Sequence, residues 1–360
     1  QWTAPATPPG LPLYTEPRLI TPGTDASHPY PETHSDRVAF SEAFQPLLDV
    51  CCESQVFLLR EKSISPPSEA ELHALIEAMA GNRHTHDLVL ANVACPGLLD
   101  LLAKVLARNT SVHGLYLPRS CGAGSGAALA ELIGRIQGLH LLDLSHCELT
   151  VADWRTIGNT LAPNSLPEDL HIGGELPSGC GAALATLLKA NECVKLLDLS
   201  DSRKLKIADW TAILRALADS TTLEELRIAC CSLEGAGVAL GSFFLANRSL
   251  KRLDIHSENP PFNRAHIKVE DWFVIADGVK NNKSLQSMNA RSACMQGAGA
   301  ALATILIRNH TIRQLDISNC PSMTIGDWLA VWAALKVNPT LEELNAGSGS
   351  MEGSGFMLSQ

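Results

Sequence analysis

Few residues of this 360-residue chain are spaced for catalysis or metal binding. The chain contains no Gly-x-Ser-x-Gly, no Walker-type phosphate loop and no His-Glu-x-x-His, the motifs that place a nucleophile, a nucleotide or a zinc ion. His84-Thr85-His86 comes nearest to a metal site, but two histidines without a third ligand are more often solvated loop residues. We therefore expect no catalytic residue, no cofactor and no metal.

The dominant pattern is instead a short apolar segment of the type Leu-x-Leu that returns at intervals of 27 to 35 residues. Its expected centres are Leu58, Val89, Tyr116, Asp143, His171, Asp198, Arg227, Asp254, Asn289, Asp316 and Asn345. Each segment predicts a strand of about three residues, and the 10–15 residues after it show helical spacing. A repeat of this length is typical of a solenoid, in which neighbouring copies bury one another's apolar sides.

The best repeat reads Leu139-x-x-Leu142-x-Leu144-x-x-Cys147-x-Leu149. The same frame recurs at 223–233 and 312–323. It resembles the leucine-rich repeat, and the long period with Cys at the Asn/Cys position is similar to the ribonuclease-inhibitor-like subclass. This resemblance covers the chain from about Val56 to its end. It implies an α/β horseshoe with a parallel sheet on the concave side and helices on the convex side.

Two kinds of repeat alternate, so the true period is a pair. One kind carries an acid followed by tryptophan, at Trp154, Trp210, Trp272 and Trp328. The other opens its helix with small residues, at 126–130, 181–185, 235–240 and 299–303. We interpret this as packing of an indole in one helix beside a small-residue face in the next, since large and small side chains interdigitate without voids. Thr150 and Thr324 stand where a capping box requires them.

Cysteine and asparagine recur with the same period. Of the eleven cysteines, Cys147, Cys231 and Cys320 occupy one inward position, and none of the eleven forms a zinc-type C-x-x-C pair. Buried reduced thiols are typical of a cytosolic protein. Four segments match the N-glycosylation pattern, at Asn109, Asn247, Asn282 and Asn309. All four fall at the same helix-to-strand turn, so repeat geometry explains them more simply than glycosylation.

Side chains alternate along a strand, which makes the outward row of the concave sheet readable. The row contains Tyr116, Asp143, His171, Asp198, Arg227, Asp254, Asn289, Asp316 and Asn345. Arg119, His256 and Arg291 flank this row. Two readings stay open: a recognition strip for a protein partner, or a ladder that pairs with itself, most clearly at Asp198-Arg227-Asp254, and keeps the sheet soluble.

The longest interval contains an insertion around 257–265, which we expect on the rim of the horseshoe. Its prolines stiffen the loop, and Phe262 and Arg264 are candidate anchors for a partner. A loop with Phe262 tucked beneath it is an equally good interpretation.

The ends of the chain differ in composition from the repeats. Residues 1–35 are rich in Pro, Thr and Ser and are predicted to lack independent structure. Residues 36–55 predict an amphipathic helix that caps the first repeat, and 56–360 is the predicted repeat domain. Because the last repeat has only begun its helix at Gln360, we expect the whole protein to continue, with room for a catalytic domain.

A net charge of −10 argues against a general nucleic-acid binder, and no apolar run is long enough for a membrane span. We expect a monomer in the cytosol that binds a protein, but no nucleic acid and no membrane.

The Gly-Ala-Ala-Leu-Ala helices at 126–130 and 299–303 are also similar to those of leucine-rich-repeat effectors of plant-pathogenic bacteria, including the GALA group. That resemblance implies type III secretion into a host cytosol and a role in ubiquitin transfer, with these repeats selecting the substrate. Residues 36–55 carry no Leu-Pro-type F-box. The alternatives are a regulator of a GTPase and a sensor fragment that holds a neighbouring domain inactive.

Overall fold

The computed structural model describes residues 56–60, 69–93, 97–136, 138–161, 163, 166–257, 267–293 and 295–347. Contacts between Cα atoms divide the chain into two units, Gln1–Ala39 and Phe40–Gln360, and every described residue belongs to the second. The Pro-rich segment 1–35, the cap at 36–55, residues 258–266 of the insertion and the last residues from 348 lie outside the described part, so those predictions stay predictions.

Among the described residues, eleven strands alternate with ten helices. The strands are β1 (Val56–Arg60), β2 (Asp87–Ala91), β3 (Gly114–Tyr116), β4 (Leu141–Asp143), β5 (Asp169–His171), β6 (Leu196–Asp198), β7 (Glu225–Arg227), β8 (Arg252–Asp254), β9 (Ser287–Asn289), β10 (Gln314–Asp316) and β11 (Glu343–Asn345). The helices are α2 (Glu69–Ala78), α3 (Leu98–Leu106), α4 (Gly126–Arg135), α5 (Val151–Thr160), α6 (Gly181–Lys189), α7 (Ile207–Leu217), α8 (Gly237–Ala246), α9 (Val269–Val279), α10 (Gly299–Arg308) and α11 (Ile325–Leu335).

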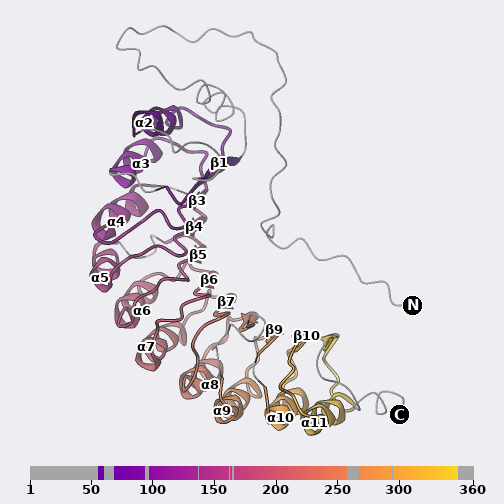
Figure 1. Ribbon diagram of the computed structural model, residues 1–360. Helices are drawn as coiled ribbons and strands as arrows, with labels where there is room; N and C mark the ends of the chain where they lie inside the picture. The colour runs from indigo at the N-terminus through magenta and orange to yellow at the C-terminus, as the bar shows by residue number, and fades with distance from the viewer. Residues whose placement is uncertain are drawn as a thin grey trace, which may run out of the picture. The chain divides into compact units, whose positions relative to one another are not determined.

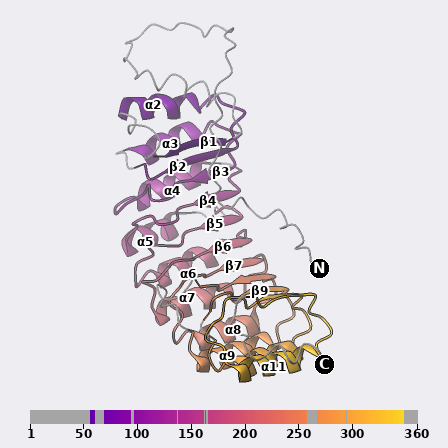
Figure 2. The ribbon, with the colours of Figure 1, turned by 45° about the vertical axis from the view of Figure 1, so that its right-hand side comes forward.

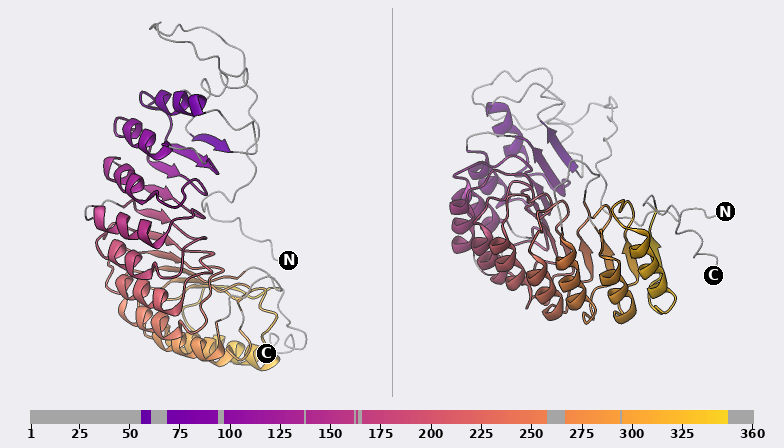
Figure 3. Two further views of the ribbon diagram at one scale, coloured as in Figure 1. Left: turned by 60° about the vertical axis from the view of Figure 1, so that its left-hand side comes forward. Right: turned by 60° about the horizontal axis from the view of Figure 1, so that its bottom comes forward.

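The strands join one parallel sheet whose order follows the chain from β1 to β11. They line the inner side of the curved repeat array, and the helices line its outer side (Figure 1). Figure 2 shows the strands from β1 to β7 following one another along the array, and Figure 3 shows the helices in the same sequence. This arrangement is the predicted leucine-rich-repeat solenoid.

The sheet has a uniform register. The middle residue of each strand from β3 to β10 is buried, and the residues before and after it face the concave side. These middle residues are Leu115, Leu142, Leu170, Leu197, Leu226, Leu253, Met288 and Leu315. From β3 onward, the residue predicted as the strand centre is in fact its last residue. The strand stops there because the chain turns at once: His146 and Asp201, three residues further on, have φ of 56° and 61°.

The tryptophans and repeat cysteines are core residues, as predicted. Trp210, Trp272 and Trp328 are fully buried, and Trp154 is nearly so. Trp210 Nε1 donates to the carbonyl of Ser232 in the following repeat at 3.1 Å. Cys147 and Cys231 are buried, and each thiol donates to a carbonyl of the preceding repeat at 3.2 Å. These residues hold consecutive repeats together.

The acid before each tryptophan joins two helices. Asp153 is buried and closes the predicted capping box, accepting from the backbone N–H of Thr150 at 2.8 Å. The same carboxylate accepts from Gly124 N at 3.1 Å and Gly126 N at 2.9 Å, where the preceding helix α4 begins. Burial raises the pKa of Asp153, but these hydrogen bonds outweigh it and hold that pKa below its ordinary value. Asp209, Asp271 and Asp327 make the same two contacts to the glycine pairs 179/181, 235/237 and 297/299.

This contact explains the glycines of the small-residue stretches. A Cβ added to Gly126 would lie 2.6 Å from Asp153 Cα and 2.8 Å from its carbonyl oxygen. The equivalent distances to the Cα atoms of Asp209 and Asp327 are 2.3 Å at Gly181 and Gly299. Glycine is required because the backbones of the paired helices touch where the carboxylate crosses between them.

An asparagine at several of the helix-to-strand turns forms a second connection. Asn282 Nδ2 donates to the carbonyls of Phe244 and Asn247 in the preceding repeat, at 2.7 and 3.0 Å. Its Oδ1 accepts from the backbone N–H groups of Ser284 and Leu285. The equivalent buried residues are Asn109, Asn247 and Asn309. All four asparagines of the glycosylation pattern therefore have their side-chain amides inside the protein.

We predict that Gly126→Ala destabilises the protein by about 1–3 kcal/mol, since the new methyl group must displace backbone of the next repeat. Gly134→Ala, in the same helix, is the matched control because nothing lies within 4 Å of its Cβ position. That change should be neutral or stabilise by up to about 1 kcal/mol. Urea unfolding of both variants measures the two effects, and equal effects would contradict a backbone contact at Gly126.

Candidate partner-binding surface

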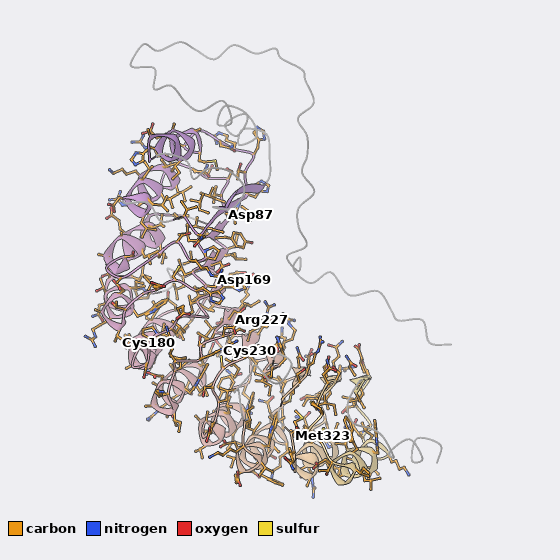
Figure 4. The ribbon with its side chains drawn as sticks, in the orientation of Figure 1. Asp87, Asp169, Cys180, Arg227, Cys230 and Met323 are labelled. Atoms are coloured by element: carbon orange, nitrogen blue, oxygen red, sulfur yellow. The ribbon has the colours of Figure 1, made fainter. Side chains whose placement is uncertain are left out.

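The predicted row of outward side chains exists as one line across the concave sheet. Its members pair in register from strand to strand, from Tyr116 beside Asp143 to Asp316 beside Asn345. Adjacent strands lie about 4.8 Å apart, so consecutive side chains are neighbours. Asp143 is buried, Asn345 is exposed, and the members between them are partly buried. Figure 4 shows Arg227 of this row on the strand side of the array.

The middle of the row pairs partly with itself. His171 Nδ1 lies 3.3 Å from Asp198 Oδ2, and Arg227 lies 4.0 Å from the same carboxylate. Arg227 is held more closely by Glu225 on its own strand, at 2.6 Å. Burial raises the pKa of Asp198, but hydrogen bonds from His171 and Ser200 lower it by more, so the pKa lies below its ordinary value. A negative charge is thereby retained at the centre of the sheet.

The C-terminal half of the row pairs differently from the prediction. We expected Asp254 to pair with Arg227, but it instead contacts His256 Nδ1 at 2.7 Å, two residues along its own chain. Arg227 pairs with Glu225 and Asp198. Asn345 Nδ2 donates to Asp316 Oδ2 at 2.9 Å, which joins the last two members of the row.

Most acids of the row also fix the turn that follows each strand. Oδ1 of Asp143, Asp198 and Asp316 accepts the backbone N–H two residues later, each at 2.8 Å. Asp254 and Asn289 do the same at 3.0 and 3.1 Å. Short polar side chains suit this turn, because the carboxylate replaces a backbone acceptor. One carboxylate oxygen is thus structural, and the other faces the concave side.

Two leucines on the concave side were not among the predicted site residues. Leu141 and Leu196 are the first residues of β4 and β6, so alternation places them on the same face as Asp143 and Asp198. Both are buried but stand apart from the main core cluster. Asp169, on the strand between them, has its pKa raised chiefly by burial. The Leu-Leu-Asp pattern of both strands is visible in the sequence, but a leucine next to a core leucine suggests a second core residue rather than one on the concave face.

The remaining predicted residues are scattered around this strip. Arg119 and Arg291 are exposed, and His256 is partly buried. Phe262 and Arg264 lie outside the described residues. In the described ranges, no group of three or more His, Cys, Asp or Glu side chains is arranged to hold a metal ion. None of the described helices is long and apolar enough to cross a membrane.

Comparison with known proteins links these repeats to one curated protein. The chain is 26% identical to pig (Sus scrofa) ribonuclease inhibitor over 216 residues, which cover 59% of this chain and 47% of the inhibitor. The match supports the ribonuclease-inhibitor-like type of repeat. This chain thus spans about half the length of the relative. No protein-family model matches the chain.

Solved structures with the same kind of fold include three that are similar in part. The leucine-rich-repeat protein LegL7 of Legionella pneumophila has 17% identity and a TM-score of 0.47, covering 80% of this chain and 92% of that one. The actin-binding site 2 of leiomodin-1 has 16% identity and a TM-score of 0.34, covering 43% and 87%. The C-terminal domain of Caenorhabditis elegans tropomodulin has 15% identity and a TM-score of 0.32, covering 43% and 89%.

We predict that the His256 imidazole titrates above its ordinary range, chiefly because Asp254 accepts a hydrogen bond from it. A raised folded-state pKa stabilises the protein fully below the unfolded value of about 6.5, and this contribution is lost as pH rises through the folded pKa. NMR titration should show the His256 pKa falling in Asp254→Asn. Asp143→Asn, four strands away, should leave it unchanged. No response to Asp254→Asn would contradict the pair.

Proposed function

We propose that the concave surface of β3–β11 binds a protein partner. The observation that carries this proposal is the continuous row of outward side chains, which keeps charge at Asp198 and Arg227 and includes the partly exposed aromatic side chain of Tyr116. The relative from pig is named for inhibiting a ribonuclease, which is a protein, and this supports a protein as the ligand.

The two halves of the strip suit different tasks. Charged groups at the centre, Asp198, Arg227 and Glu225, favour steering and orientation of a partner, because complementary charge raises the rate of encounter and fixes register. Tyr116 lies towards the N-terminal end of the row, and aromatic side chains of this kind contribute much of the binding free energy in typical interfaces. A partner that displaces the internal pair of Arg227 must replace its two carboxylate contacts.

For the biological setting, we propose that these repeats select the substrate of a bacterial effector that acts in host ubiquitin transfer. Support for this comes from the Gly-Ala-Ala-Leu-Ala helices, which are similar to those of the GALA group. In that role the chain works as a monomer in the host cytosol, and a ligase domain elsewhere in the whole protein supplies the chemistry. A small GTPase or a domain of the same protein as captured partner would favour the regulator or sensor alternative.

The concave site is tested by affinity. The immobilised chain captures its partner from a cell extract, mass spectrometry identifies it, and calorimetry then measures its Kd. Tyr116→Ala and Arg227→Ala should each weaken binding by about tenfold or more, the loss expected for a residue central to an interface.

The control for charge is Arg215→Ala, which removes an exposed arginine from the convex helix α7. It should bind as the parent does. Melting temperatures of all three variants confirm that they fold. Parental affinity in both concave variants would remove this surface from consideration.

A further inference from the structure

A hollow lies away from the concave row, at the edge where each helix connects to the next strand. It has a volume of about 320 Å³ and is formed by three successive repeats, those of β9, β10 and β11. Its lining includes Lys283, Gln286, His310, Arg313, Leu341 and Glu342. Lys283 and His310 directly follow the turn asparagines Asn282 and Asn309. Gln286, Arg313 and Glu342 each stand immediately before a strand. The hollow thus arises from the turn geometry that the repeats share, and here its lining carries the basic side chains of Lys283, His310 and Arg313.

Its basic character stands out against the net charge of −10. Lys283 is exposed and makes no ion pair with the part of the chain that the structure describes. Arg313 is also exposed, and among the described residues it pairs with Glu342 of the next repeat, which lines the same hollow. The amide of Gln286 and the ring of His310 add hydrogen-bond donors on the same lining. An anion in the hollow would meet donors from two repeats at once.

The backbone offers few donors for that anion, because most of the turn N–H groups are already occupied. Asn282 Oδ1 accepts from Ser284 and Leu285, and the next asparagines do the same for Thr311, Ile312, Thr340 and Leu341. Recognition must therefore come from side chains, with charge as its main component. Pro339 and Leu341 form an apolar wall beside the cations, which suits the methylene or backbone of a peptide rather than a free ion.

The ion pair between Arg313 and Glu342 indicates how much charge the ligand needs. A ligand with a single carboxylate would only exchange the Glu342 carboxylate at Arg313 for another, so its binding would gain little free energy. A phosphate monoester carries about −1.5 to −2 charge at pH 7 and three acceptor oxygens, so it can engage Arg313 and Lys283 together. We propose that this hollow, the basic turn groove, binds a phosphorylated side chain on a peptide segment of a protein partner.

The test uses the full chain and a fluorescent peptide with one phosphoserine flanked by alanines, followed by anisotropy. The phosphopeptide should bind saturably and at least about tenfold more tightly than peptides with Ser or Glu at that position. Lys283→Gln and Arg313→Gln should each lose most of that preference. Glu342→Gln should tighten binding several-fold, because it releases Arg313; a merely structural pair would not produce that gain.

The matched control is Arg248→Gln, which removes an exposed arginine from the turn position equivalent to Lys283 one repeat earlier, outside the groove. It should bind as the parent does. Equal losses in Arg248→Gln would show nonspecific attraction and overturn the proposal. Three other results would also overturn it: no saturable binding, inorganic phosphate competing as well as unlabelled phosphopeptide, or variants that alter binding to anionic vesicles instead of the peptide.

Discussion

Buried polar side chains that cross from one repeat to the next are the constraint on which this structure depends. Every repeat leaves backbone N–H and C=O groups at its turns and helix ends, and stacking removes them from water. Asp153 satisfies two donors of α4 while it caps its own helix α5, and Asn282 serves two carbonyls and two N–H groups. Since each such residue contacts two repeats, sequence spacing and stacking distance are locked together.

These connections also decide which polar residues are free to act. The turn asparagines and the bridging aspartates use their polar atoms in hydrogen bonds within the fold, although the glycosylation and capping patterns mark them as candidates for other roles. On the concave side, one carboxylate oxygen of Asp198 serves a turn, and the rest of its capacity is shared with His171 and Arg227. What remains for recognition is the pattern of retained charge, together with Tyr116 and the exposed cationic side chains of the turns.

Much of this organisation could be read from the sequence because it is periodic. The strand spacing, the outward row, the buried tryptophans and the capping boxes at Thr150 and Thr324 follow from local rules applied once per repeat. The bridge from Asp153 to Gly126 could not be read, because it requires knowing which helix ends meet in space. Of the two predicted partners of Arg227, Asp198 is confirmed and Asp254 was wrong: Glu225 on the same strand pairs with Arg227, while Asp254 pairs with His256.

The central claim is that buried polar side chains at the turns, such as Asn282, join consecutive repeats. It is tested most directly by urea unfolding of Asn282→Ala beside Asn281→Ala, its exposed neighbour. Asn282→Ala leaves four backbone groups without partners and should lower the free energy of unfolding by at least about 3 kcal/mol. Asn281→Ala should change it by less than about 0.5 kcal/mol. Equal effects of the two substitutions would contradict the account.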